Sequence, residues 1–184
     1  MKKNLKKKLT TIKEFINQSI GEWKSIRSTH SLAFQEFENT NSVIKISYFD
    51  NDQTVKNVIN QFNYKFKIQT CFSVNISWRA ESSWSTDNSK KTNQTLLIFS
   101  PRDIRSGIIF RDKGYAESIH STSEYILDDN SELNIITTYS ETLSEERIWF
   151  LSENVRSRYS VVKNKTHNSI LQTSFSTEIR KIIN

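Results

Sequence analysis

Short runs in which apolar and polar residues alternate fill most of the chain after residue 20. Because successive side chains of a β-strand point to opposite faces, this alternation predicts strands with one buried face. Asn, Asp, Ser and Gly, which favour turns, separate the runs. Many short strands with few helices predict an all-β fold, an antiparallel barrel or sandwich, and closure into a barrel removes exposed edges. The expected strands, about ten, are residues 21–37, 42–49, 70–81, 95–102, 108–117, 121–127, 132–140, 147–151, 155–163 and 171–179.

Two segments show helical spacing instead. Leu5, Leu9, Ile12 and Ile16 recur every three or four residues, which predicts a basic amphipathic helix over residues 5–18 with one apolar stripe packed on the body of the protein. A membrane-surface role for this helix is the alternative interpretation. The apolar positions of residues 52–62 follow the same spacing and predict a second, short helix.

The net charge of +6 comes from one end of the chain. Residues 1–13 hold six lysines and no acidic residue, so the remainder carries equal numbers of acidic and basic residues. A protein that binds nucleic acid is expected to spread its basic residues over a face of the fold, so we expect no nucleic-acid partner. No apolar run is long enough to span a membrane or to form the core of a signal peptide, so we expect a soluble protein with no membrane partner.

Several classes of catalytic and metal site are excluded by composition and spacing. Cys71 is the only cysteine, which rules out an intrachain disulfide and indicates a reducing compartment. It lies in an alternating apolar run and is expected to be a small core residue. The three histidines stand far apart, so no metal site is predicted. Three glycines in the whole chain form no Gly-x-Ser-x-Gly nucleophile elbow and no glycine-rich phosphate loop.

Residues 145–160 place charged side chains among aromatic and β-branched ones. If residues 152–154 form a turn, Glu146 shares a strand face with Phe150, and Arg156, Arg158 and Ser160 share a face of the next strand. Two interpretations fit this pattern. The arginines hold an anion inside the fold, or they belong to a solvated ladder of charges on its outside.

Other residues are candidates for the same binding site. Trp78 and Trp84 flank the start of a polar loop, where indoles are able to stack on a flat conjugated ligand, although Trp78 also fits an ordinary core position. Arg27 and His30 on the first strand and Glu178 on the last add further polar groups.

Two resemblances follow from these residues. Gly21-Glu22-Trp23 after a helix, together with Arg180 on the last strand, resembles the pattern of lipocalin-like (calycin) barrels, in which the arginine covers the tryptophan at the closed end. A larger set of motifs, in order along the chain, is similar to the S-type phycobiliprotein bilin lyases of the CpcS/CpeS family. These motifs are residues 21–27 with His30 and 32–34, then Ser77-Trp78, then 111–117, 145–150, 154–158 and 174–180.

This resemblance implies a ten-stranded lipocalin-like barrel over residues 20–184, a single bilin-binding domain on which the basic helix of residues 1–19 packs. It implies a lyase that takes phycoerythrobilin or phycocyanobilin as substrate, needs no cofactor, and joins the pigment by a thioether to a cysteine of an apo-phycobiliprotein, which we expect to be the β subunit. Glu146 and Arg156 are then the expected catalytic residues. The expected bilin-binding residues are Trp78, Trp84, Arg158, Ser160, Glu178 and Arg27.

Roles follow from the chemistry of the pigment. Guanidinium groups suit its two propionates, and carboxylates suit its pyrrole N–H groups. A non-catalytic bilin carrier is the alternative function, and an assembly factor that never touches pigment is a third. The expected location is the plastid of a phycobiliprotein-containing alga or the cytoplasm of a cyanobacterium, and a homodimer is left open.

Overall fold

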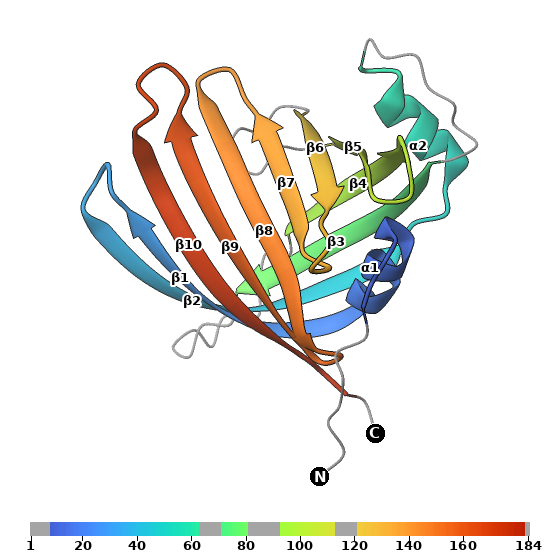
Figure 1. The fold of residues 1–184 in the computed structure, drawn as a ribbon, viewed down its shortest axis with the longest axis horizontal. Coiled ribbons are helices and arrows are strands. Elements are labelled where there is room, and N and C mark those ends of the chain that lie inside the picture. The colour runs from blue at the N-terminus through green and yellow to red at the C-terminus, as the bar shows by residue number, and fades with distance from the viewer. Residues whose placement is uncertain (1–7, 63–70, 81–92, 113–120, 183–184) are drawn as a thin grey trace.

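The protein is a closed, antiparallel ten-stranded β-barrel with two helices (Figure 1). The computed structural model describes residues 8–62, 71–80, 93–112 and 121–182. Each strand pairs with its neighbours in the sequence, and β1 also pairs with β10, which closes the barrel and confirms the predicted fold class. The strands are β1 (Gly21–Ser31), β2 (Glu36–Tyr48), β3 (Phe72–Ala80), β4 (Asn93–Pro101), β5 (Ser106–Arg111), β6 (Ser121–Leu127), β7 (Leu133–Thr138), β8 (Thr142–Ser152), β9 (Val155–Asn164) and β10 (Ile170–Arg180).

Several boundaries differ from the prediction. Strand β2 begins at Glu36 and not at residue 42, and β8 begins at Thr142 and not at residue 147. Two further differences have a local cause. The first expected strand, residues 21–37, contains a turn at residues 32–35, where Gln35 adopts a left-handed φ of 56°. The turn has no Gly, Pro or Asn to mark it, so the alternation seemed unbroken. The N-terminal helix, expected from residue 5, begins at Ile12. Thr11 caps it, because its hydroxyl accepts from the amide of Glu14 while the Glu14 carboxylate accepts from the Thr11 amide.

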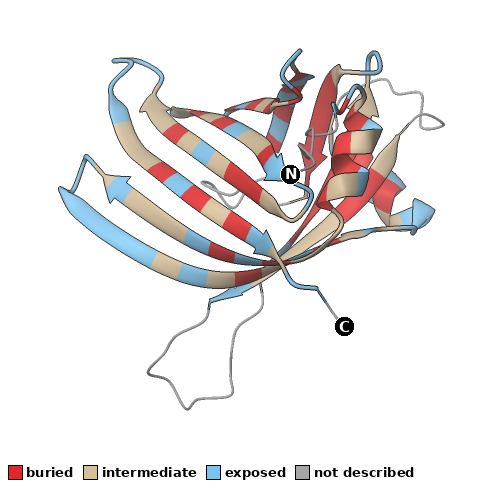
Figure 2. Cartoon of the chain, turned by 60° about the horizontal axis from the view of Figure 1, so that its bottom comes forward, coloured by how far each residue is buried: buried red, intermediate tan, exposed pale blue. Residues whose placement is uncertain are grey.

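The two ends of the barrel differ in character. One end carries the turns β1–β2, β7–β8 and β9–β10, and we call it the mouth. Helix α1 (Ile12–Ser19) packs at the other end, which we call the α1 end. There Ile12, Phe15 and Ile16 join a buried cluster with inward-facing Trp23 and Phe150. Figure 2 shows the buried residues of the strands concentrated away from the exposed β1–β2 tip. The α1 end is therefore an apolar plug.

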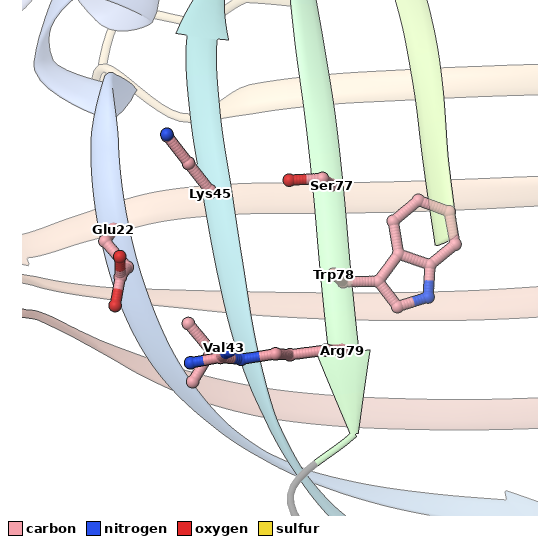
Figure 3. Close-up of a pocket in the computed structure, with 6 residues that line it drawn as sticks. All are labelled: Glu22, Val43, Lys45, Ser77, Trp78 and Arg79. Atoms are coloured by element: carbon pink, nitrogen blue, oxygen red, sulfur yellow. The ribbon is translucent and has the colours of Figure 1, made fainter. Parts of the chain in front are cut away.

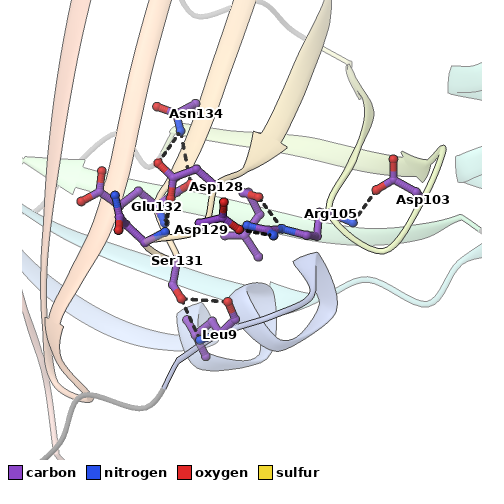
Figure 4. A network of polar contacts seen from close by, with 10 residues as sticks. Leu9, Asp103, Arg105, Asp128, Asp129, Ser131, Glu132 and Asn134 are labelled. Atoms are coloured by element: carbon purple, nitrogen blue, oxygen red, sulfur yellow. Dashed lines mark hydrogen bonds and ion pairs between the residues drawn. The ribbon is translucent and has the colours of Figure 1, made fainter.

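Hydrogen bonds fix the segment before α1 to the barrel (Figure 4). Ser131 in the β6–β7 turn accepts from the Leu9 amide at 2.9 Å and donates to the Leu9 carbonyl at 2.8 Å. Arg105 in the β4–β5 turn donates to the Leu127 carbonyl and pairs with Asp129. These contacts tie three connections of the α1 end together, so the plug is held by polar bonds at its edge as well as by apolar burial.

The second helix, α2 (Asp52–Ile59), covers the outside of the barrel. Val55, Val58 and Ile59 pack on outward-facing residues of β4 and β5, among them Ile98 and Phe110. Half-buried Cys71 packs against this outer cluster, and burial raises the pKa of its thiol. Cys71 is therefore an outer packing residue and not an activated nucleophile.

The glycine, tryptophan and arginine of the lipocalin-like pattern form one unit. Gly21 has a φ of 134°, and a Cβ added there would lie 2.6 Å from Nη1 of Arg180. The absent side chain leaves room for the Arg180 guanidinium, which lies 4.3 Å from the centre of the Trp23 ring and donates to the carbonyls of Gln18 and Ile20. Trp23 is fully buried and donates to the Ser19 carbonyl. The pattern thus joins the end of α1 to the first and last strands.

We expect Gly21→Ala to lower the free energy of unfolding by roughly 2–4 kcal/mol, because a strained φ costs about 1–3 kcal/mol and the clash with Arg180 adds to it. In an Arg180→Ala background the same change should cost only the backbone part, roughly 1–3 kcal/mol. Urea unfolding of the four proteins measures both values. Lys24→Ala, at an exposed position of β1, is the control and should be nearly neutral. An equal cost in both backgrounds would mean that Arg180 does not occupy this space.

Candidate functional site

Inward-facing side chains change from apolar to polar between the α1 end and the mouth. On β8 the order is Phe150, Ile148, Glu146 and Ser144, and on β9 it is Arg156, Arg158 and Ser160. Exposure rises in the same direction on β9, from buried Arg156 to Arg158, whose side chain is 34% exposed. Inward-facing groups that solvent reaches show that the mouth half of the barrel is accessible, whereas the α1 half is filled.

Glu146 lies at the centre of this polar half and pairs with two arginines. One carboxylate oxygen is 3.3 Å from Nη2 of Arg111 on β5, and the other pairs with Nη2 of Arg158 on β9. Its side chain is 6% exposed. Burial by itself raises the pKa of a carboxyl, but Arg158 and Arg111 outweigh burial and lower the pKa of Glu146 below its ordinary value. Glu146 is therefore a charged carboxylate inside the barrel.

Arg156 and Glu178 form a second buried ion pair closer to the plug. They lie opposite one another on β9 and β10, and Nε of Arg156 donates to the Glu178 carboxylate. The Arg156 guanidinium also lies 4.5 Å from the centre of the Trp23 ring. Trp23 thus contacts Arg156 and Arg180. This pair forms the floor of the polar half.

The remaining expected residues take different positions. Ser160 shares a 2.8 Å hydrogen bond with Ser174 on β10, and half-buried Arg27 donates to Thr29 at 3.1 Å on the inward face of β1. His30 does not join Arg27, because it lies exposed on the other face of β1 with its ring 4.8 Å from that of Phe37. Trp84 lies outside the described residues.

Trp78 is half-buried on β3, in register with inward-facing Ile44. Figure 3 shows its indole on the opposite side of the strand from Ser77 and Arg79. A pocket of about 200 Å³ lies on the other side of the strand, on the outer face of the barrel, and is lined by Glu22, Val43, Lys45, Ser77, Trp78 and Arg79. Pockets that hold drug-sized ligands usually measure about 300–1,000 Å³, so this one is too small for a large conjugated ligand.

The charged residues between 145 and 160 divide between the two faces of the sheet. Glu146, Arg156 and Arg158 point inward, which excludes the solvated-ladder interpretation for them. Glu145 and Arg147 point outward and pair there with Lys163 and Glu132. The ladder exists, but only on the outer face.

Arg111 is a polar residue of this interior that the sequence analysis did not select. It belongs to the motif at residues 111–117, yet its role depends on Glu146, which comes three strands later in the barrel. Its inward position follows from alternation with buried Phe110 on the outer face. The sequence offered two signals that could have selected Arg111, namely its place in the motif and the strand alternation that turns it inward.

This arrangement suits an anionic ligand with N–H groups. In the two buried ion-pair clusters, three arginines, at 111, 156 and 158, face two glutamates, at 146 and 178, and Arg27 adds a further guanidinium group on the inward face of β1. Guanidinium groups bind carboxylates, and a charged carboxylate accepts from N–H donors. Among the described residues, no group of three or more His, Cys, Asp or Glu side chains is placed to hold a metal ion. None of the helices that the structure describes is long and apolar enough to cross a membrane.

Comparison with known proteins identifies the family. The model of the CpeS-like proteins matches residues 11–181. "Chromophore lyase CpcS/CpeS 3" of Trichodesmium erythraeum is 35% identical over 92% of this chain and 98% of its own length, and "Chromophore lyase CpcS/CpeS 2" of a Synechococcus strain is 32% identical over 94% and 91%. The solved structure of the S-type phycobiliprotein lyase CPES from Guillardia theta superposes with a TM-score of 0.77 at 27% identity, over 95% of each chain. The motif, the barrel and these matches agree, and the chain belongs to the family of CpeS-like proteins.

Proposed function

We propose that this protein is a chromophore lyase, which binds an open-chain tetrapyrrole in the mouth half of the barrel and attaches it to a cysteine of an apo-phycobiliprotein. The observation that supports this most is the buried cluster of Arg111, Glu146 and Arg158. An isolated barrel has no structural need for such a cluster, because well-packed apolar residues are often as stable as a buried ion pair or more so. An assembly factor that never binds pigment would have no use for it.

The charges suggest a division of roles. Arg158, the most exposed of the buried-cluster arginines, is placed to meet a propionate. Glu146, held as a carboxylate by two arginines, is placed to accept from the pyrrole N–H groups and to favour a protonated, cationic pigment. Arg156 and Glu178 support the site from below, and Arg27, Ser160 and Trp78 complete its walls. The role of Trp84 stays a prediction.

The reaction is the addition of a thiol to a carbon–carbon double bond. Sulfur bonds to the ethylidene carbon of the pigment. The thiol loses a proton and the neighbouring ring carbon gains one, so the addition needs no oxidant and no leaving group. Protonation of the pigment withdraws electron density and makes that carbon more electrophilic. The protein adds orientation, which is worth up to about 7–11 kcal/mol for well-aligned reactants. The thiol comes from the partner, which fits a chain whose one cysteine packs outside the barrel.

The preferred bilin, the choice of the β subunit, a homodimer and the location stay predictions. The relatives named above include cyanobacterial proteins, which is consistent with a cyanobacterial cytoplasm or a plastid.

Glu146→Gln should separate a lyase from a carrier. The amide preserves the shape of the site but removes the charge that favours a protonated pigment, so transfer to apo-phycobiliprotein should slow more than pigment affinity falls. Affinity is measured by absorbance titration with phycocyanobilin and phycoerythrobilin, and transfer by pigment that survives acid-urea denaturation. Equal attachment with wild type, with Glu146→Gln and with no protein added would leave only a carrier.

Arg158→Ala should weaken pigment binding by about 1.5–3 kcal/mol, the usual value of a hydrogen bond to a charged group. Arg147→Ala is the matched control, since Arg147 lies on the neighbouring strand but points outward. Titration of both variants with the same pigment makes the comparison. Equal losses of affinity would argue against an inward binding site.

The stability of the protein should depend on pH through Glu146. Because its pKa is lowered in the folded state, Glu146 contributes stability above the ordinary value of 4.5, and this contribution is lost as the pH falls through the lower folded-state pKa. Urea unfolding between pH 6 and about pH 3 should therefore show a steeper loss of stability for wild type than for Glu146→Gln. Parallel curves would show that Glu146 is not held as a carboxylate by its arginines.

A further inference from the structure

Four buried side-chain polar atoms have no hydrogen-bond partner within the described part of the chain, and two of them lie at the mouth end of the wall formed by β5 and β6. These two are Nε of Arg111 and Oγ of Ser121. The two residues lie directly opposite one another on the paired strands, and both point inward. Side chains in such cross-strand pairs have Cβ atoms about 4.5–5.5 Å apart, so the free N–H and the free hydroxyl are neighbours.

This pair of donors is costly unless a ligand uses it. A buried polar group without a partner loses its hydrogen bonds to water and gains none in return, and the loss is larger when the group is charged. The other polar groups nearby are satisfied, since Nη2 of Arg111 pairs with Glu146, and the hydroxyls of Ser123 and Thr137 bond one another at 2.7 Å. Nε of Arg111 and Oγ of Ser121 therefore form a cross-strand pair of unsatisfied donors on the mouth side of the Ser123–Thr137 pair, whereas the unsatisfied hydroxyls of Thr142 and Tyr125 lie on β8 and in the apolar cluster.

We infer that Arg111 and Ser121 form a subsite for one carboxylate of the ligand, a propionate of the open-chain tetrapyrrole. A carboxylate oxygen accepts two hydrogen bonds at once, and a charged acceptor best offsets the burial of a guanidinium. The buried clusters hold three guanidinium groups against two carboxylates, which favours an anionic ligand. The subsite lies on β5 and β6, away from Arg158 on β9, so the two arginines meet the ligand from different walls with Glu146 between them. This inference rests on the proposed function and names a contact within it.

The test uses two variants that each delete one unpartnered hydroxyl from β6. Ser121→Ala removes the proposed donor. Tyr125→Phe removes the Tyr125 hydroxyl, which is also buried and without a partner among the described residues but lies in the apolar cluster of the α1 half. Since neither hydroxyl makes a bond to any of the described residues, both variants should keep or raise the melting temperature. Only Ser121→Ala should lose affinity for phycocyanobilin, by roughly tenfold, the effect of one hydrogen bond to a charged group.

A second arm identifies the group that is bound. The same titrations with phycocyanobilin dimethyl ester, which lacks both carboxylates, should show no difference between wild type and Ser121→Ala. A loss of affinity that is equal for acid and ester would place another part of the pigment at Ser121 and overturn the carboxylate assignment. Unchanged affinity of Ser121→Ala for the acid, with wild type binding normally, would overturn the subsite and leave the proposed function standing. Failure of wild type to bind phycocyanobilin or phycoerythrobilin would remove both.

Discussion

Charges inside the barrel must be paired, and this constraint organises the half of the molecule that faces the mouth. Moving an ion out of water costs several kcal/mol even after the surroundings relax, so each inward arginine needs a carboxylate close by. Glu146 meets this need for two arginines at once, because its two oxygens face β5 and β9. Glu178 does the same for Arg156. The ion pairs of the polar half are therefore a connected network with more guanidinium groups than carboxylates, and not a set of independent contacts.

Apolar burial in the other half of the barrel offsets the free-energy cost of burying these charges. Helix α1 and the inward residues of the strands bury a continuous apolar cluster. Trp23 belongs to this cluster and also contacts Arg156 of the Arg156–Glu178 ion pair. Apolar burial contributes about 25 cal/mol per Å², which makes the plugged end the main source of stability. The side chains near the mouth bury less apolar surface, so a change there costs less stability than one in the Gly21, Trp23 and Arg180 unit, unless it leaves a buried charge without its partner.

Local patterns predicted what depends on local spacing. Alternation placed Glu146, Arg156 and Arg158 on common faces, and the short turn, expected at residues 152–154 and observed at 153–154, brings those faces together. The turn at residues 32–35 was missed because none of its residues is a usual turn former, and its left-handed residue is a glutamine. Arg111 was missed for another reason. Its partner lies across the barrel, and strand alternation says which face a side chain takes but not which distant side chain it will meet. The closed barrel, which brings distant strands together, was predicted instead from the resemblance to a known family, and that resemblance rested on several motifs together.

The plug at the α1 end also fixes the order of events. A molecule that occupies this barrel enters and leaves by the same opening, so the part that goes in last is the part that a partner meets first. For a linear pigment with two different ends, the direction of entry then decides which terminal ring is presented to a thiol. A barrel open at both ends would leave that choice to chance. Under the proposed function, helix α1 would thereby restrict which terminal ring of the pigment faces the thiol, because it closes the other end of the barrel.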